Sequence, residues 1–392
     1  MDIRDGSFPG AAKAVESKSS RNYGIDLLRL VCMYLICILH VCGQGGAMIH
    51  VIGNEATWYT TYFLETAAYC AVNTYGMISG YVGITARHRP ARIVELWMTV
   101  FWYSALGTLA GVFLFGLPVS EDTLWKAIFP TMWKTYWYFS AYVGVFLAGP
   151  YLNRMVKTLS LAEKKRLLLA LFAVFSVFTC IPRASETGSD FLGIGAGYSF
   201  LWLAVMYLMG ALVRCLIDES PKDTQDFLHK KSWFYGILYL VCVVITWMSK
   251  FLIEGCTEQI FGERRYGRIL FSYAGPTVVI CAFALLMIFS RLQIKSRTGK
   301  GLIKALAPMA FSVYLVQVQP YFWSFALDDS CRNIAEKSPI GAFFSVIGCA
   351  ALLYMICTGI DIVRALLFHL LHIRRWAEIF TGFVLRPFHQ YH

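Results

Sequence analysis

Charged residues are scarce in this sequence. Asp, Glu, Lys and Arg make up 15% of the 392 residues, whereas a soluble globular chain has about a quarter. Hydrophobic residues reach 57% and fall into runs of about 18 to 25, enough to cross the roughly 30 Å hydrocarbon core of a bilayer. These features exclude an ordinary soluble protein and predict an all-α, polytopic transmembrane helical bundle.

The sequence also lacks internal repeats, low-complexity runs and any Pro- or Gly-rich linker that would divide it. We therefore expect one transmembrane domain over residues 23–372. Residues 1–22 are polar and do not resemble a cleavable signal peptide, so we expect a disordered cytoplasmic tail there. Residues 373–392 are expected to form a short cytoplasmic tail.

Twelve cysteines are present, but most lie within apolar runs, where Cys behaves as a small hydrophobe. Cys32, Cys37 and Cys42 recur every five residues and spread around a helix, so they cannot bind one metal ion, and we expect no metal site. Cys256 and Cys331 fall in predicted external loops and could pair. The net charge of +11 would suggest nucleic-acid binding in a soluble protein. Here we attribute it to membrane topology and expect no nucleic-acid partner.

Hydropathy and helix-breaking residues predict ten membrane spans. With the amino terminus inside, the cytoplasmic segments hold 25 Lys and Arg and the external loops hold 9. This bias predicts an even number of spans with both termini in the cytoplasm. The ninth span is interrupted by Pro308 and ended by Pro320. The expected ranges are 24–45, 58–84, 93–117, 135–152, 167–182, 197–216, 233–253, 268–290, 302–322 and 340–368.

The first span, "GIDLLRLVCMYLICILHV", carries three ionisable residues in otherwise apolar sequence. Arg29 and His40 are eleven residues apart, which places them about 20° apart on one helix face and about 16.5 Å apart along the axis. Asp26 lies three residues before Arg29, close enough to pair with it and orient it. The alternative is that Asp26 and Arg29 snorkel to the cytoplasmic surface while His40 lies at an interface.

Further polar residues occur in the second predicted span. Glu65 and Asn73 are eight residues apart, on about the same helix face, and could line a cavity. Ser79 and Tyr81 form part of the segment "MISGYVGI", in which Gly80 could equally serve close helix packing.

Several of these segments resemble motifs of the acyltransferase-3 family of integral membrane O-acyltransferases. The first is R-x10-H, from Arg29 to His40, preceded by "GIDLLR". In the late segment "FSVYLVQVQP", Gln317 stands where many members of the family have His, which weakens any role assigned there. The other matching pieces are "MISGYVGI" at 77–84, "RPAR" at 89–92 and "YWYFSAYVGVFLAGPYLNRM" at 136–155.

The resemblance implies transfer of an acyl group, usually acetyl from acetyl-CoA, to a hydroxyl of an extracytoplasmic glycan or cell-wall sugar. Arg29, Arg89 and Arg92 would then bind the phosphates of acyl-CoA, for which the guanidinium fork is suited. Without the family pattern, the basic residues of "RHRPAR" are equally explained by the positive-inside rule, as a loop that keeps this side of the span in the cytoplasm.

Histidine titrates near neutral pH, so His40 is the candidate base that deprotonates the acceptor hydroxyl. Alternatively, the acyl group could first rest on a protein residue, with Tyr138 or Tyr142 as the candidate relay. The competing reading of these tyrosines is amphipathic aromatic packing.

A secondary transporter or flippase is the main alternative, with Arg29 and His40 binding an anionic substrate or relaying protons. We see no internal symmetry of the kind that transporters often show. An anchoring role for another enzyme is a third possibility. We expect a multi-pass protein of the inner or plasma membrane. It could act with a separate acceptor-modifying partner or form a homo-oligomer, and the sequence leaves both possibilities open. The sequence does not identify the acceptor.

Overall fold

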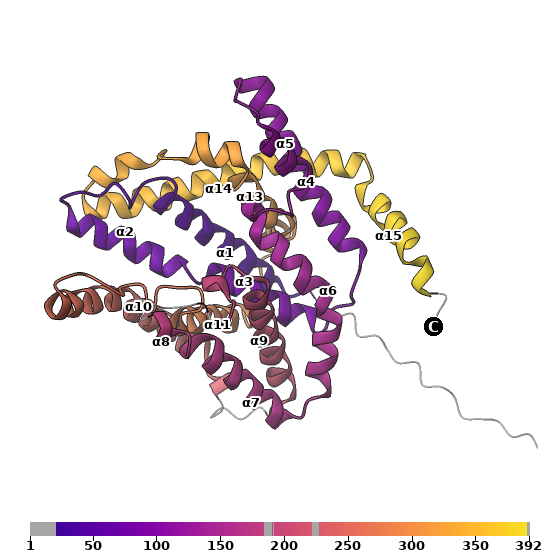
Figure 1. Cartoon of the computed structure of the whole chain (residues 1–392). Helices are drawn as coiled ribbons and strands as arrows, with labels where there is room; N and C mark the ends of the chain where they lie inside the picture. The colour runs from indigo at the N-terminus through magenta and orange to yellow at the C-terminus, as the bar shows by residue number, and fades with distance from the viewer. Residues whose placement is uncertain (1–20, 184–189, 191, 222–226, 390–392) are drawn as a thin grey trace, which may run out of the picture.

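The computed structural model describes residues 21–183, 190, 192–221 and 227–389, and their regular structure is entirely helical (Figure 1). Most of the tail expected over 1–22 lies outside these residues. The elements are α1 (Tyr23–Cys42), α2 (Glu55–Ala68), α3 (Ala71–Gly83), α4 (Ala91–Phe115), α5 (Glu121–Ile128), η1 (Lys134–Tyr136), α6 (Trp137–Thr158), α7 (Leu161–Phe172), η2 (Ala173–Val177), α8 (Cys180–Arg183), η3 (Gly195–Gly197), α9 (Phe200–Glu219), η4 (Phe227–His229), α10 (Ser232–Phe261), α11 (Pro276–Ser290), α12 (Arg297–Leu306), η5 (Ala307–Met309), α13 (Ala310–Gln317), η6 (Phe322–Leu327), η7 (Arg332–Glu336), α14 (Pro339–Leu370) and α15 (Ile373–His389).

Six helical segments within the described ranges are long and apolar enough to cross a membrane. The helix α11 is apolar as well, but it has only 15 residues. The fold is therefore a helical membrane bundle, while the count of ten spans stays a prediction for the shorter and interrupted segments. The six segments are Tyr23–Cys42, Ala91–Phe115, Phe200–Glu219, Ser232–Phe261, Arg297–Gln317 and Pro339–Leu370.

The segment predicted as one span over 58–84 consists of two successive helices, α2 and α3. The helices α2 and α3 meet at Tyr69 and Cys70, both of which keep right-handed helical backbone angles. The ring of Tyr69 stacks on Tyr273 at 4.6 Å and packs on Phe271 at 4.1 Å. These contacts bring the irregular loop before α11 against the junction between the two helices.

Helix starts are set by side-chain caps, because the first backbone N–H groups of a helix have no partner within it. Asn22 caps α1 by accepting from the N–H of Ile25, and Ser199 caps α9 by accepting from Trp202. Ser338 caps α14, with Pro339 in the first turn, where proline needs no hydrogen bond. The beginning of α1, which matters for the site below, is thus fixed by local sequence.

The tightest helix crossing joins α3 to α9 through two glycines. A Cβ atom at Gly80 would lie 1.8 Å from the carbonyl oxygen of Tyr207, and one at Gly210 would lie 2.0 Å from that of Met77. Only hydrogen fits at both positions, so the two backbones lie in direct contact, as small residues permit in membrane bundles. The packing reading of Gly80 is therefore confirmed.

The disulfide that the sequence left possible between Cys256 and Cys331 is not formed. Both cysteines are free, with Cys256 exposed on α10 and Cys331 buried. The helix α10 continues to Phe261, beyond the predicted span end at 253, so Cys256 lies on a helix face rather than in a loop. Cys331 lies instead beside Cys349 of α14, within side-chain hydrogen-bonding reach.

Residues 373–389 of the expected carboxyl-terminal tail form α15, which leaves the body of the protein at its end (Figure 1). The helix is amphipathic and packs against α4, burying Ala377 completely. It therefore lies beside the loop between α3 and α4, which carries the predicted arginine motif.

Candidate active site

A large cavity of about 1210 Å³ runs through the bundle beside α1. It exceeds the roughly 300–1,000 Å³ typical of a site for one small ligand. Charged residues gather at one end, which we call the arginine end, and a histidine with several aromatic residues lines the other, the histidine end. The arginine end comprises Arg21, Asp26, Arg29, Arg87, His88, Arg89 and Arg92; the histidine end comprises His40, Gln44, Glu65, Tyr69, Trp137, Tyr198, Arg268, Tyr273 and Trp323.

At the arginine end, Asp26 holds two guanidinium groups. Its Oδ1 accepts from Arg29 at 2.5 Å and its Oδ2 accepts from Nε of Arg21 at 2.5 Å. Asp26 is 6% exposed, so the two arginines compensate the cost of burying its charge. The first turn of α1 thereby presents an oriented cationic surface to the cavity.

The loop between α3 and α4 adds the predicted Arg89 and Arg92 to this end. Arg92 pairs with Glu95 at 3.7 Å, while Arg89 contacts Glu95 at 3.4 Å and Glu378 of α15 at 3.0 Å. These arginines are exposed, and exposed ion pairs are worth at most about 1 kcal/mol. A phosphate ligand can therefore replace the glutamates as partners of these arginines at little cost in free energy.

His88 in the same loop packs on Phe146 with ring centroids 4.5 Å apart. Partial shielding from water lowers the pKa of the His88 imidazole below its ordinary value, which favours its neutral form. The positive charge at this end of the cavity is therefore carried by arginines.

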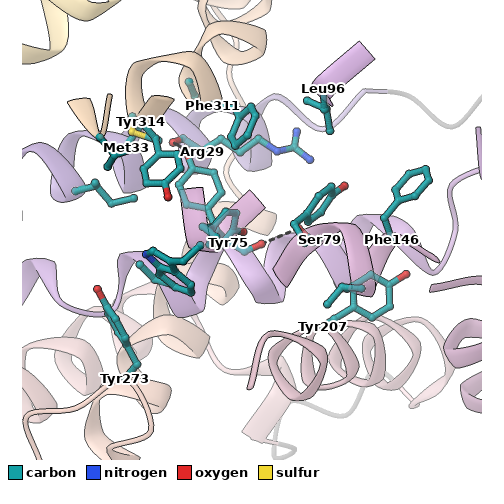
Figure 2. Close-up of a pocket in the computed structure, with 18 of the residues that line it drawn as sticks. Arg29, Met33, Tyr75, Ser79, Leu96, Phe146, Tyr207, Tyr273, Phe311 and Tyr314 are labelled. Atoms are coloured by element: carbon teal, nitrogen blue, oxygen red, sulfur yellow. Dashed lines mark hydrogen bonds between the residues drawn. The ribbon is translucent and has the colours of Figure 1, made fainter. Parts of the chain in front are cut away.

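The middle of the cavity is lined by aromatic and hydroxyl side chains from four helices. The Tyr75 hydroxyl donates to the carbonyl of Arg29 at 2.5 Å, and Ser79 Oγ donates to the carbonyl of Tyr75 at 2.9 Å. Figure 2 shows Tyr75 in the centre, between Tyr273 on one side and Leu96 on the other. The predicted relay candidates Tyr138 and Tyr142 also line this section, from α6.

At the histidine end, His40 is held by Gln317, the residue that departs from the family motif. The Nδ1 of His40 lies 2.7 Å from Oε1 of Gln317. The Nε2 of Gln317 donates to the carbonyl of Val313 at 3.1 Å. A backbone carbonyl can only accept, so this bond fixes which end of the amide faces His40.

This arrangement determines the tautomer of His40. Because an amide oxygen is only an acceptor, Nδ1 must carry the proton, which leaves the lone pair of a neutral imidazole on Nε2. The ring is also fixed sideways by Trp323, edge to face at a centroid distance of 5.0 Å. His40 is thus presented in the form that a general base requires.

The structure brings all the sequence-predicted site residues to one cavity: Asp26, Arg29, His40, Arg89, Arg92, Tyr138 and Tyr142. Of the two polar residues considered on the second span, Glu65 lines the cavity. Asn73 is buried elsewhere, where it donates to the carbonyl of Tyr273 at 2.6 Å and accepts from the indole of Trp202 at 2.9 Å.

The sequence did not reveal Gln317, Trp323 or Arg268 as site residues. Gln317 lies 277 residues from His40, so no spacing within one helix could have joined them. The only signal was its place in the late family-like motif, because a glutamine within a membrane span is itself costly and implies a partner.

These observations define a polytopic helical membrane protein whose cavity joins a cationic end to a histidine that is held by a glutamine through Nδ1. A family model described as an acyltransferase domain matches residues 22–358. The chain therefore belongs to the acyltransferase-3 family and is a membrane acyltransferase. Comparison with curated proteins and with solved structures found no match.

Proposed function

We propose that the protein transfers an acyl group, most simply acetyl, from cytoplasmic acyl-CoA to a sugar hydroxyl on the external side of the inner or plasma membrane. The observation that carries this proposal is the continuity of one cavity between Arg29 and His40. Both termini and the arginine end would face the cytoplasm, as the distribution of Lys and Arg indicates.

The donor fits this cavity by charge and by length. Guanidinium groups bind phosphate oxygens in bidentate geometry, so the phosphates of acyl-CoA belong at the arginine end. Its thioester lies at the end of a long arm, which would pass Tyr75 and reach His40 about 16.5 Å deeper along α1. The volume of about 1210 Å³ leaves room for an acceptor beside the donor.

In the proposed reaction, the acceptor hydroxyl attacks the thioester carbonyl while its proton passes to Nε2 of His40. The new C–O bond forms, the C–S bond breaks, and His40 returns the proton to the departing thiolate. Gln317 keeps Nδ1 protonated throughout, because its amide oxygen accepts only. Asp26 contributes indirectly by orienting Arg29.

A covalent relay through Tyr138 or Tyr142 is the alternative route. Both tyrosines line the cavity, but the contacts of Tyr138 with Tyr75 and Tyr314, at centroid distances of 6.3 and 6.2 Å, are those of an aromatic cluster. We therefore favour direct transfer. An acetylated protein trapped in single turnover, and lost in Tyr138→Phe or Tyr142→Phe, would instead establish the relay.

The test uses the purified full chain in phospholipid nanodiscs with radiolabelled acetyl-CoA. We expect wild type to bind the donor and release CoA. His40→Ala should bind it within about threefold of wild type but lose at least about 100-fold in turnover, the share of a general base. Arg29→Ala should weaken donor binding about tenfold or more, since a hydrogen bond to a charged group is worth about 1.5–3 kcal/mol.

The matched controls are His369→Ala and Arg154→Ala, whose side chains are exposed and outside the cavity. Both should behave as wild type. Failure of wild type to bind acetyl-CoA, together with substrate flux across a vesicle membrane, would refute the enzyme assignment and support a transporter.

A further inference from the structure

We infer that the histidine end of the cavity contains the acceptor subsite and that it recognises a sugar ring. The subsite consists of an aromatic wall, Trp137, Tyr198, Tyr273 and Tyr69, and a polar pair, Glu65 and Arg268, all of which line the cavity. This inference rests on the proposed acyl transfer and names the part of the protein that selects its acceptor.

The four aromatic rings form a connected chain. Trp137 contacts Tyr198 at a centroid distance of 4.7 Å, Tyr198 contacts Tyr273 at 5.0 Å, and the Tyr69 ring stacks on Tyr273 at 4.6 Å. The first two pairs are tilted by 57° and 59°, so the wall is curved rather than flat. The apolar C–H face of a sugar packs on such rings, and the tyrosine hydroxyls supply polar partners.

Glu65 supplies a hydrogen-bond acceptor that the protein itself does not use. Its Oε2 is fully buried and has no hydrogen-bond partner within the described residues. A buried polar atom of this kind is costly unless something bonds to it. Since the side chain lines the cavity, a hydroxyl donor of the ligand is the partner that the site offers it.

Arg268 makes the pair suitable for a neutral ligand. It lies within electrostatic reach of Glu65, lines the cavity and is exposed. Lys250 also acts on Glu65 but is itself paired with Glu254, so this end of the cavity lacks the excess of positive charge that the arginine end carries. A carboxylate acceptor beside a guanidinium donor matches the hydroxyl groups of a sugar, each of which can both donate and accept.

Glu65 of the polar pair lies near the depth of His40. The thiol of Cys42 at the end of α1 contacts the carbonyl of Thr61 on α2 at 3.9 Å. His40 lies two residues from Cys42, and Glu65 lies four residues from Thr61. Because the two helices are antiparallel, these are offsets of about 3 and 6 Å in the same direction. A sugar hydroxyl bound near Glu65 is therefore level with the candidate base.

The loop before α11, which carries the Tyr273 ring of this wall, is held by hydrogen bonds to two helical segments. The carbonyl of Tyr273 accepts from Asn73 at 2.6 Å, and that of Ala274 accepts from Ser176 at 2.8 Å. Irregular backbone at membrane depth is tolerated where protein buries it or a cavity adjoins it. Both conditions hold here, so the subsite is formed before any ligand binds.

The test measures acyl transfer from acetyl-CoA to methyl glycosides by the full chain in nanodiscs, since maltoside detergents would compete with the acceptor. We expect methyl glycosides to be acetylated with a kcat/KM at least tenfold above that for glycerol or propanol. Trp137→Leu should raise the KM for the glycoside at least tenfold with a change below twofold in acetyl-CoA affinity, and Trp137→Phe should restore most of the loss. Glu65→Gln should raise the same KM at least fivefold.

The control is Trp233→Leu, on an exposed face of α10 outside the cavity, which should behave as wild type. If wild type neither binds nor consumes acetyl-CoA, the proposed function itself fails. If it consumes acetyl-CoA but acetylates no glycoside, or acetylates simple alcohols equally well, the sugar subsite is refuted. Equal glycoside KM values in wild type, Trp137→Leu and Glu65→Gln would refute it as well.

Discussion

At the scale of single residues, the bond between His40 and Gln317 separates this protein from the motif it otherwise follows. A histidine at position 317 could exchange a proton with His40, whereas an amide cannot ionise. In the proposed reaction Gln317 is a positioning residue, because it contacts His40 and would act on the reaction only through that ring. Its Oε1 fixes the tautomer, and its Nε2 is anchored to Val313.

We predict that Gln317→Met lowers kcat about 10- to 100-fold, part of the roughly 10²–10⁴ that a positioned base contributes. The affinity for acetyl-CoA should stay within about twofold, because the arginine end is unchanged. Gln317→Glu should recover most of the rate, since a carboxylate still accepts from Nδ1. Steady-state kinetics with donor binding by calorimetry measure both quantities. An equal loss of kcat in the Glu and Met variants would show that Gln317 acts only through packing.

At the scale of elements, the crossing of α3 and α9 holds one wall of the cavity in place. Ser79 lines the cavity while the adjacent Gly80 contacts the backbone at Tyr207. Asn153 of α6 links the same two helices, because it accepts from the Tyr207 hydroxyl at 2.9 Å and donates to the carbonyl of Gly83 at 3.0 Å. The family-like segment "MISGYVGI" thus serves packing and site construction together.

We predict that Gly80→Ala destabilises the protein by about 2 kcal/mol or more, because the new methyl would overlap the carbonyl of Tyr207 and force the helices apart. Thermal unfolding of the protein in nanodiscs, followed by circular dichroism, measures the loss. Gly348→Ala on α14 is the matched control, since nothing lies within 4 Å of the added Cβ there. Equal melting temperatures for the two variants would contradict the tight crossing.

A second pair of elements, α4 and α14, is joined by a buried charge. Asp361 is fully buried and accepts two bonds from Arg364, at 2.6 and 2.9 Å, and one from the Tyr103 hydroxyl at 2.5 Å. Removing one partner of such a pair costs about 3–5 kcal/mol, because the other charge is left buried and unpaired. This ionisable cluster is structural, since none of its three residues lines the cavity.

At the scale of the whole molecule, the proposed direction of transfer depends on which side each cavity end faces. The distribution of Lys and Arg predicts that the loop after α10 is external and the segment before α12 is cytoplasmic. The donor would then enter from inside and the acceptor from outside, with the thioester and the hydroxyl meeting near His40.

We predict that Glu263→Cys is labelled by a membrane-impermeant maleimide in intact cells, whereas Thr298→Cys is labelled only after permeabilisation. Both positions are exposed in the structure. Each variant also carries Cys256→Ser, because Cys256 is exposed and would itself be labelled. Mass-shift gel electrophoresis reads the labelling. Labelling of both positions from the same side would overturn the orientation of the proposed reaction.

The sequence by itself determined the membrane class, the pairing of Asp26 with Arg29 and the alignment of Arg29 with His40. These are local properties, set by apolar run length, a three-residue spacing and the 3.6-residue helical period. The same period placed Glu65 and Asn73 on one face, but the interruption at Tyr69 and Cys70 separated them. The periodic argument holds only while the helix stays continuous.

The tertiary structure alone decided which residues complete the site. Trp323 and Arg268 reach the cavity from segments more than 200 residues beyond α1, and Gln317, from the same distant part of the chain, reaches His40. Their placement follows from how the helices pack. An unpaired polar side chain in an apolar span reveals that a partner must exist. It does not reveal which one, because many packings can satisfy the same hydrogen bond and only the folded bundle selects among them.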